Sequence, residues 1–164
     1  MQGYVRIINE AKRYVYMETP YFLPTEPVLF AMQTAALAGV DVRLMIPRKT
    51  DSHFLNWASR TYVYDVINSG VKIYLYEKGF LHSKLLICDD SLSTCGSTNI
   101  DFRSFENNLE VNAFFYDEGM ALRLKSVFMN DMKNCFLLNS VPNHKRPFVF
   151  RMWESIVRVI SPLL

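Results

Sequence analysis

The chain has 164 residues, of which 50% are hydrophobic and 14% aromatic, a composition typical of one folded domain with a full core and not of a disordered chain. Its 18 basic and 16 acidic residues give a formal net charge of +2, which is too small to indicate a nucleic-acid partner. No stretch reaches the roughly 20 uninterrupted apolar residues of a spanning helix. We therefore expect a globular protein that does not cross a membrane. Because the basic residues are scattered and form no stripe, we also expect no nucleic-acid partner.

Apolar segments with strand and helix character alternate along the chain, starting with a helix-like segment at the first residues. Pro27 in the first turn and Gly39 after the last mark one helix, and Gly70 ends another. This alternation predicts an α/β layered sandwich, with a mixed, mostly parallel sheet flanked by helices. In chain order we expect strands at 14–18, 42–46, 72–76 and 109–116, helices at 26–38, 52–69 and about 118–132, and a hairpin between 82 and 99.

Three cysteines, Cys88, Cys95 and Cys135, show no metal-ligand spacing. We interpret them as buried free thiols, which fits a reducing compartment, although a disulfide between the first two stays open. The sequence therefore predicts no metal site and no cofactor.

The segment HSKLLICDDSLSTCGSTN, which begins at His82, is the most informative part of the chain. In an extended strand, alternate side chains share a face, so His82 and Lys84 project together and Ser83 points away. The DDSLST stretch is typical of a turn, which would bring Ser97 and Asn99 back beside the same pair. The segment thus predicts a cluster of an imidazole, an ammonium, a hydroxyl and an amide.

Such a cluster suits a phosphoryl group without a metal. Lys84 can neutralise non-bridging phosphate oxygens, and Ser97 and Asn99 can donate hydrogen bonds to them. His82 can attack phosphorus or shuttle a proton, because the pKa of a free imidazole is about 6.5. The alternative is a core histidine in a polar hairpin.

The spacing favours the first interpretation, because the segment resembles the HxKxxxxDxxxxxxGSxN signature of the phospholipase D superfamily at every specified position. Asp89 and Gly96 fill two of these positions. Asp89 faces away from the histidine and lysine by alternation, so we interpret it, together with Gly96, as a structural residue that supports the site.

Glu110 extends the resemblance, because it follows His82 by 28 residues (110 − 82). The superfamily places an acidic side chain here, and the resemblance implies that it hydrogen-bonds the motif histidine. A carboxylate on the second ring nitrogen would fix the tautomer and stabilise the imidazolium. The alternative is a solvated glutamate that opens a strand.

The remaining sequence resembles the C-terminal catalytic half of bacterial cardiolipin synthases. The matching runs are TPYFLP, EPVLFAMQTAALAGVDVRLMIP and DFRSFENNLEVNAFFYD, so the likeness covers nearly the whole chain. It implies a phosphatidyl transfer between two phosphatidylglycerol molecules that gives cardiolipin and glycerol through a phosphohistidine. Water as the acceptor would give phospholipase D activity instead.

Only one HxK motif is present, whereas enzymes of the superfamily use two. The resemblance implies that this motif supplies the acid and base and that an N-terminal half, absent here, supplies the attacking histidine. We therefore suspect a fragment. The alternatives are a homodimeric single-motif phosphodiesterase or nuclease, with the second motif in trans, and a catalytically incomplete membrane-binding fragment.

The end of the chain has a different character, so we expect a catalytic half-domain at 1–138 and a basic amphipathic tail at 139–164. Apolar residues with a stripe of polar ones predict a helix within 147–164. A helix of this kind can lie in the bilayer interface, and the alternative is that it docks on its own domain or on a second lobe. We expect peripheral attachment to the cell membrane for this chain and a membrane anchor in a longer protein.

Overall fold

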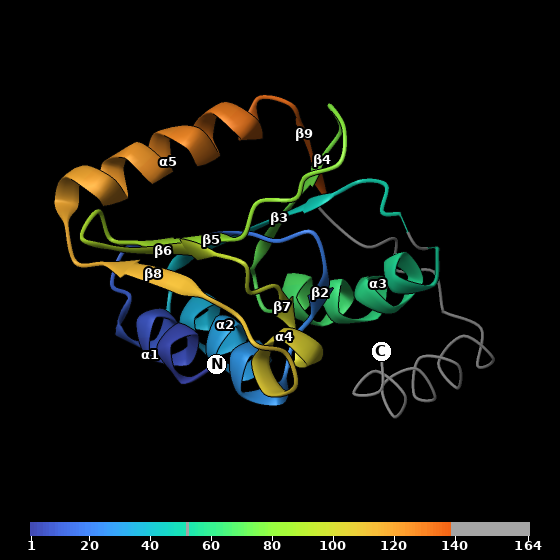
Figure 1. Cartoon of the computed structure of the whole chain (residues 1–164), viewed down its shortest axis with the longest axis horizontal. Coiled ribbons are helices and arrows are strands. Elements are labelled where there is room, and N and C mark those ends of the chain that lie inside the picture. Colours follow the sequence, from blue (N-terminus) through green and yellow to red (C-terminus); the bar gives the residue numbers. More distant parts are fainter. Residues whose placement is uncertain (52, 139–164) are drawn as a thin grey trace.

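A seven-stranded sheet forms the middle layer of the protein, in the order β8-β6-β5-β1-β3-β4-β9 (Figure 1). The computed structural model describes residues 1–51 and 53–138, so the predicted amphipathic helix at 147–164 lies outside the described residues. In chain order the strands are β1 (Tyr14–Glu18), β3 (Asp41–Pro47), β4 (Lys72–Tyr76), β5 (Leu85–Cys88), β6 (Leu92–Gly96), β8 (Asn112–Phe115) and β9 (Cys135–Leu138).

Helices cover both faces of this sheet. Figure 1 shows α5 (Glu118–Met132) alone on one face and the other helices on the opposite face. Those helices are α1 (Gln2–Glu10), α2 (Glu26–Leu37), α3 (His53–Asn68) and the short α4 (Phe102–Glu106). Two short strands, β2 (Phe22–Leu23) and β7 (Ile100–Asp101), pair in parallel as a separate small sheet. The predicted layered sandwich with a mixed sheet is therefore confirmed.

The prediction of a mostly parallel sheet is wrong. Of the six neighbouring pairs in the large sheet, β1–β3 and β3–β4 are parallel and the other four are antiparallel. Parallel neighbours need a long crossover, which α2 and α3 provide, whereas antiparallel neighbours need only short connections. The hairpin of β5 and β6, the strand β8 and the final strand β9 use the second kind of pairing.

The central strand β1 shows how the sheet is held between the helices on its two faces. All five of its residues are buried, as expected for a strand covered on both faces. Val15 and Met17 belong to the larger core under α1, α2 and α3, while Tyr14 and Tyr16 belong to the core under α5. Tyr16 stacks on Phe128 of α5 with 5.0 Å between ring centroids. The sheet is thus fixed between two apolar cores.

Local signals in the sequence set the ends of two helices. Thr25 is the N-cap residue of α2, and Pro27 lies in its first turn. Gly39 and Gly70 follow α2 and α3 with φ angles of 90° and 97°, a conformation that residues with a side chain rarely adopt. The predicted starts and stops of these helices are confirmed to within a residue or two.

The cysteines are free, but only Cys88 is fully buried, so the prediction of three buried thiols is partly wrong. The β5–β6 register places Cys88 opposite Leu92 and Cys95 opposite Leu85. The two thiols are therefore not cross-strand neighbours, and the disulfide left open by the sequence is not formed. Burial raises the pKa of Cys88 to about 12, so this thiol is a poor nucleophile.

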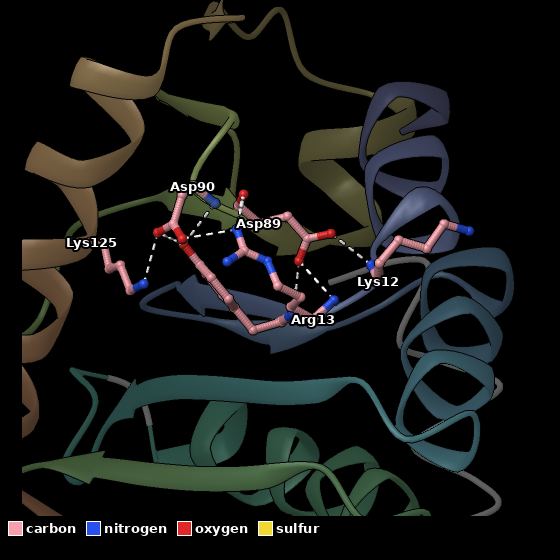
Figure 2. A network of polar contacts seen from close by, with 6 residues as sticks. Lys12, Arg13, Asp89, Asp90 and Lys125 are labelled. Carbon is pink, nitrogen blue, oxygen red and sulfur yellow. Dashed lines mark hydrogen bonds and ion pairs between the residues drawn. The ribbon is translucent and has the colours of Figure 1, made fainter.

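Asp89 ties the β5–β6 turn to the start of β1 (Figure 2). Its carboxylate accepts hydrogen bonds from the backbone N–H groups of Lys12, Arg13 and Tyr14, at 2.6, 2.9 and 2.8 Å. Burial opposes ionisation of Asp89, yet these N–H groups hold its pKa below the usual value. Because β5 separates it from Lys84, Asp89 lies at the opposite end of this strand from the histidine and lysine of the motif.

Asp90 extends this network to α5. Its carboxylate accepts hydrogen bonds from Arg13 at 2.9 Å, from the Tyr14 hydroxyl at 2.7 Å and from Lys125 of α5 at 2.7 Å (Figure 2). Asp89 and Asp90 have φ angles of 50° and 60°, in the left-handed region that aspartate tolerates better than most residues. The turn thus joins the hairpin, the central strand and the covering helix.

We expect Asp89→Ala to lower the free energy of unfolding by about 2 kcal/mol or more, because three N–H groups lose a charged acceptor. Urea denaturation at pH 7 measures this change. The control is Glu10→Ala, which removes an exposed ion pair with Arg6 and should change stability by less than about 0.5 kcal/mol. Equal effects of the two substitutions would contradict the structural role of Asp89.

Candidate active site

His82 and Lys84 lie directly before β5, which begins at Leu85. The prediction that the pair sits within a strand is therefore wrong by a few residues. The segment still runs beside β6, because the Gly96 N–H donates a hydrogen bond to the Lys84 carbonyl at 3.2 Å. The Lys84 ammonium donates to the His82 carbonyl at 2.8 Å, which folds the lysine back over the histidine.

The two faces of this segment have different partners. The Ser83 hydroxyl donates to Glu18 at the end of β1, on the side of the sheet that α5 covers. Burial lowers the pKa of Lys84, and the charges of Glu110 and Asp101 oppose this shift. Lys84 thus lies near the carboxylates of Glu110 and Asp101. The preceding residue, Ser83, is bonded to the carboxylate of Glu18.

The imidazole of His82 is exposed and packs beside the ring of Phe80, with 5.6 Å between ring centroids. Phe80 in turn lies 6.3 Å from the ring of Tyr21, which belongs to the TPYFLP loop. The hydroxyl of Tyr21 donates to Asp51 at 2.8 Å. The aromatic loop therefore borders the motif histidine through Phe80.

Glu110 has partners other than the expected one. Its carboxylate accepts hydrogen bonds from the Ser97 hydroxyl and from the Ser104 hydroxyl, the second at 3.0 Å. The bond from Ser97, followed by that from Ser104, holds its pKa below the usual value against the opposing effect of burial. Within the described part of the chain no hydrogen bond joins Glu110 to the His82 ring, so the bond implied by the resemblance is not formed in this structure.

Ser97 makes a closed set of hydrogen bonds. Its hydroxyl donates to Glu110 and accepts from the Val111 N–H at 3.0 Å, and its own N–H donates to the Val111 carbonyl at 3.0 Å. The hydroxyl hydrogen that the sequence assigns to a phosphate is therefore used by Glu110 here. The structure brings Ser97 and Glu110 together, which the sequence did not predict.

The sequence also missed Ser104. Its N–H donates at 2.6 Å to the carboxylate of Asp101, the N-cap residue of α4, and its buried hydroxyl reaches Glu110. An aspartate is a preferred N-cap residue and therefore a helix-start signal. That signal predicts the cap, whereas the contact with Glu110 depends on the fold.

Asn99 is the remaining residue that the sequence assigns to the phosphate. Its side-chain oxygen is buried and has no hydrogen-bond partner among the described residues. The residue lines a small cavity of about 130 Å³ between Tyr21 of the aromatic loop and Arg103 of α4. A buried acceptor without a partner is unfavourable, so Asn99 marks this cavity as a place for a polar group.

Gly96 permits the close approach of the chain that carries Glu110. A Cβ atom on Gly96 would lie 2.2 Å from the Val111 carbonyl oxygen and 2.7 Å from the Asn112 Cα. Both contacts are with backbone, which cannot move away without breaking the β6–β8 pairing. Only glycine therefore fits at this position of the motif.

Glu18 is the most unusual titratable group beside the motif. It is 1% exposed, and its second carboxylate oxygen has no partner in the described part of the structure. Burial raises its pKa to about 7, the Ser83 hydrogen bond lowers it, and the charge of Asp131 adds to the rise. The sequence does not single out Glu18, because one glutamate at the end of an apolar strand gives no motif.

Two further properties concern the described residues as a whole. In residues 1–51 and 53–138, no three histidine, cysteine, aspartate or glutamate side chains are grouped as metal ligands. None of the helices in the same ranges is long and apolar enough to cross a bilayer.

Comparison with known sequences identifies a family. Residues 4–132 match the family described as "Cardiolipin synthase, PLD-like domain". A cardiolipin synthase of Clostridium perfringens (strain SM101 / Type A) is 44% identical over 162 residues, which are 99% of this chain and 34% of the relative. Cardiolipin synthase 1 of Staphylococcus epidermidis (strain ATCC 12228 / FDA PCI 1200) is 45% identical over 162 residues, 99% of this chain and 33% of the relative. The chain thus spans about a third of the length of these relatives.

Solved structures share the fold. Nuc of Salmonella typhimurium, a phospholipase D family member, superposes with a TM-score of 0.74 at 20% identity, over 85% of this chain and 90% of that one. A phosphatidylserine synthase of Haemophilus influenzae Rd KW20 gives a TM-score of 0.70 at 15% identity, over 98% of this chain and 44% of that one. At such identities the likeness concerns the fold alone.

The raised pKa of Glu18 predicts a pH-dependent stability. Between the unfolded pKa near 4.5 and the folded value of about 7, the folded state binds more protons than the unfolded state. The contribution of Glu18 to stability is therefore fully present below about pH 4.5 and is lost as the pH rises through 7, by up to about 3 kcal/mol. We expect Glu18→Gln to remove this fall when urea denaturation is compared at pH 5 and pH 8.

The matched control is Glu106→Gln, which replaces an exposed glutamate and should leave the pH profile of the wild type in place. A Glu18→Gln profile that falls as steeply as the wild type between pH 5 and pH 8 would contradict the assignment of the fall to Glu18.

Proposed function

Because the chain belongs to the cardiolipin synthase, PLD-like domain family, we propose that it supplies one of the two HxK motifs of a phosphatidyltransferase. The reaction converts two phosphatidylglycerol molecules into cardiolipin and glycerol. The 44% identity to a cardiolipin synthase over 99% of this chain supports this choice of substrate. The observation that carries the proposal is the grouping of the motif lysine with Glu110 and its serine partners beside an exposed histidine.

The proposed reaction has two steps. A histidine attacks the phosphorus of one phosphatidylglycerol, so that a phosphorus–nitrogen bond forms, and glycerol departs with a proton from the second histidine. A hydroxyl of the other phosphatidylglycerol then attacks the phosphohistidine, loses its proton to the second histidine and forms cardiolipin. In the assignment that the resemblance implies, His82 is the proton-transferring histidine and the other motif holds the attacking one.

The remaining site residues bind the phosphate and orient the His82 ring. Lys84 neutralises the non-bridging phosphate oxygens, and Asn99 and Ser97 donate hydrogen bonds to them. Glu110 orients the His82 ring and stabilises its protonated form. In the structure the Ser97 hydroxyl is bonded to Glu110, so both of these roles require a rearrangement when the phosphate binds.

The second motif has to come from elsewhere. The relatives are about three times as long as this chain, so we place the other motif in the part of the longer protein that this chain does not include. The side chains that flank Glu110 are exposed and apolar, Leu109 at 104% and Val111 at 80%. Apolar surface beside the site favours a partner half or lipid chains there, and not open solvent.

A second candidate is a phosphodiesterase in which two copies of this chain face each other and each provides one motif. The likeness to Nuc favours it, because this chain covers 90% of that protein, so the same fold exists as a chain of similar length. A third candidate is an inactive membrane-binding fragment. For the first and third candidates we propose peripheral attachment to the cell membrane through residues 147–164, within a longer membrane-anchored protein.

We expect His82→Ala, made in a complete two-motif protein that contains this sequence, to lower cardiolipin formation at least about 100-fold, because proton transfer to glycerol is lost. Mass spectrometry of phosphatidylglycerol vesicles measures the product. The control is Lys133→Ala, an exposed lysine after α5. Cardiolipin formation by His82→Ala at the wild-type rate would refute the assignment.

Experiments on the isolated chain distinguish the three candidate functions. We expect it to bind vesicles that contain phosphatidylglycerol but to produce no cardiolipin, because one motif is missing, and removal of residues 147–164 should abolish binding. Sedimentation gives the solution mass, and a soluble phosphodiester such as bis(4-nitrophenyl) phosphate tests for a dimeric enzyme. Turnover of that compound by a dimer would instead favour the second candidate.

A further inference from the structure

The buried carboxylate of Glu18 has no part in the chemistry proposed above, yet it lies directly beneath the motif. Glu18 ends β1 and is paired with Leu85, the first residue of β5, and with Met45 of β3. One of its oxygens accepts the hydrogen bond from Ser83, the residue between His82 and Lys84. The other oxygen has no partner among the described residues.

A carboxylate is an unfavourable occupant of this position. The preceding residues on the same face of β1, Tyr14 and Tyr16, pack in the apolar core under α5, as does the strand neighbour Leu85. An apolar side chain would fill the space without the loss of hydration that a charge suffers on burial. The presence of Glu18 is therefore explained by the group that its carboxylate binds, and among the described residues its side chain is hydrogen-bonded to Ser83 alone.

We propose that Glu18 is a positioning residue that acts through Ser83 to direct His82 and Lys84 toward the phosphate. In an extended chain neighbouring side chains point to opposite faces. Fixing Ser83 toward the α5 side thus directs the residues on both sides of it to the opposite face, where the charges of Glu110 and Asp101 act on Lys84. This role of Glu18 rests on the proposed function of the motif.

The segment needs such an anchor because residues 81–84 precede the strand. A backbone hydrogen bond, from the Gly96 N–H to the Lys84 carbonyl, joins the segment to β6. The Ser83–Glu18 bond adds a second attachment, on another strand and through a side chain. With two attachments on different strands, the segment is fixed in rotation as well as in position.

The surroundings of Glu18 make this anchor sensitive to pH. The charge of Asp131, at the end of α5, disfavours the ionised form of Glu18, and the charge of Glu18 in turn contributes to the raised pKa of Cys135 at the start of β9. The pKa of Glu18 is raised to about 7 by burial. Above this pH the bond from Ser83 is charge-assisted and stronger. The motif is therefore held more firmly at pH 8 than at pH 6, although the fold as a whole is less stable there.

The test uses the full 164-residue chain without lipid. Hydrogen exchange of the Gly96 amide reports whether the segment stays attached to β6, and the NMR signals of the His82 ring report its surroundings. We expect Ser83→Ala and Glu18→Ala each to speed exchange of the Gly96 amide about tenfold at pH 8, the loss of one hydrogen bond. Their combination should have no larger effect than either alone, because both remove the same contact.

Two further variants separate positioning from general stability. Glu18→Gln keeps an oxygen that accepts from Ser83, so it should restore the protection of the Gly96 amide at pH 8. It should also abolish the change in the protection factor (the intrinsic exchange rate divided by the observed one) between pH 6 and pH 8. Ser93→Ala removes another serine hydroxyl from the same face, one that is fully buried and has no hydrogen-bond partner among the described residues. It should leave Gly96 exchange and the His82 signals unchanged.

Wild-type Gly96 exchange and wild-type His82 signals in Ser83→Ala would overturn the proposal, and so would an equal response to Ser93→Ala. These measurements need neither a second motif nor phosphatidylglycerol. Their failure would leave phosphatidyl transfer standing, and a failure to form cardiolipin in the complete protein would leave the anchoring of the motif standing.

Discussion

The geometry of the site depends on the hydrogen bonds of one carboxylate, that of Asp89, to three consecutive N–H groups at the start of β1. These bonds set the register between β1 and β5, in which Val15 faces Cys88 and Glu18 faces Leu85. A shift by one residue would turn every side chain of β5 to the other face of the sheet. Asp89 is thus distant from the histidine and still determines which way it points.

The β6 side of the motif hairpin depends on Gly96, which has no side chain. At Gly96 the Val111 carbonyl comes so close that no Cβ fits. This approach brings Ser97 within hydrogen-bond reach of both Val111 and Glu110. The specified residues of the motif are therefore of two kinds: some are those that we propose carry the chemistry, and others, such as Asp89 and Gly96, set the distances between strands.

The sequence predicted what is encoded locally. The strand at 14–18, the helix at 118–132, the hairpin turn and the helix ends near Gly39 and Gly70 agree with the structure to within a residue or two. It did not predict whether neighbouring strands are parallel or antiparallel, nor did it predict the strand β9, because these depend on segments far apart in the chain. The partners of Glu110 were missed for the same reason. Ser97 and Ser104 come from different elements, and a single sequence does not show which of them a carboxylate will meet.

The bond between Ser97 and Glu110 has a consequence for how substrate binding and proton transfer are coupled. A hydroxyl has one hydrogen, so Ser97 serves either Glu110 or a phosphate oxygen at a given moment. A phosphate that takes this hydrogen removes the main cause of the low pKa of Glu110 and makes its oxygen available to an imidazole. By thermodynamic linkage, protonation of that imidazole then favours the bound phosphate in return. In the proposed reaction, Ser97 thus couples the binding of the phosphate to the availability of Glu110 for the imidazole.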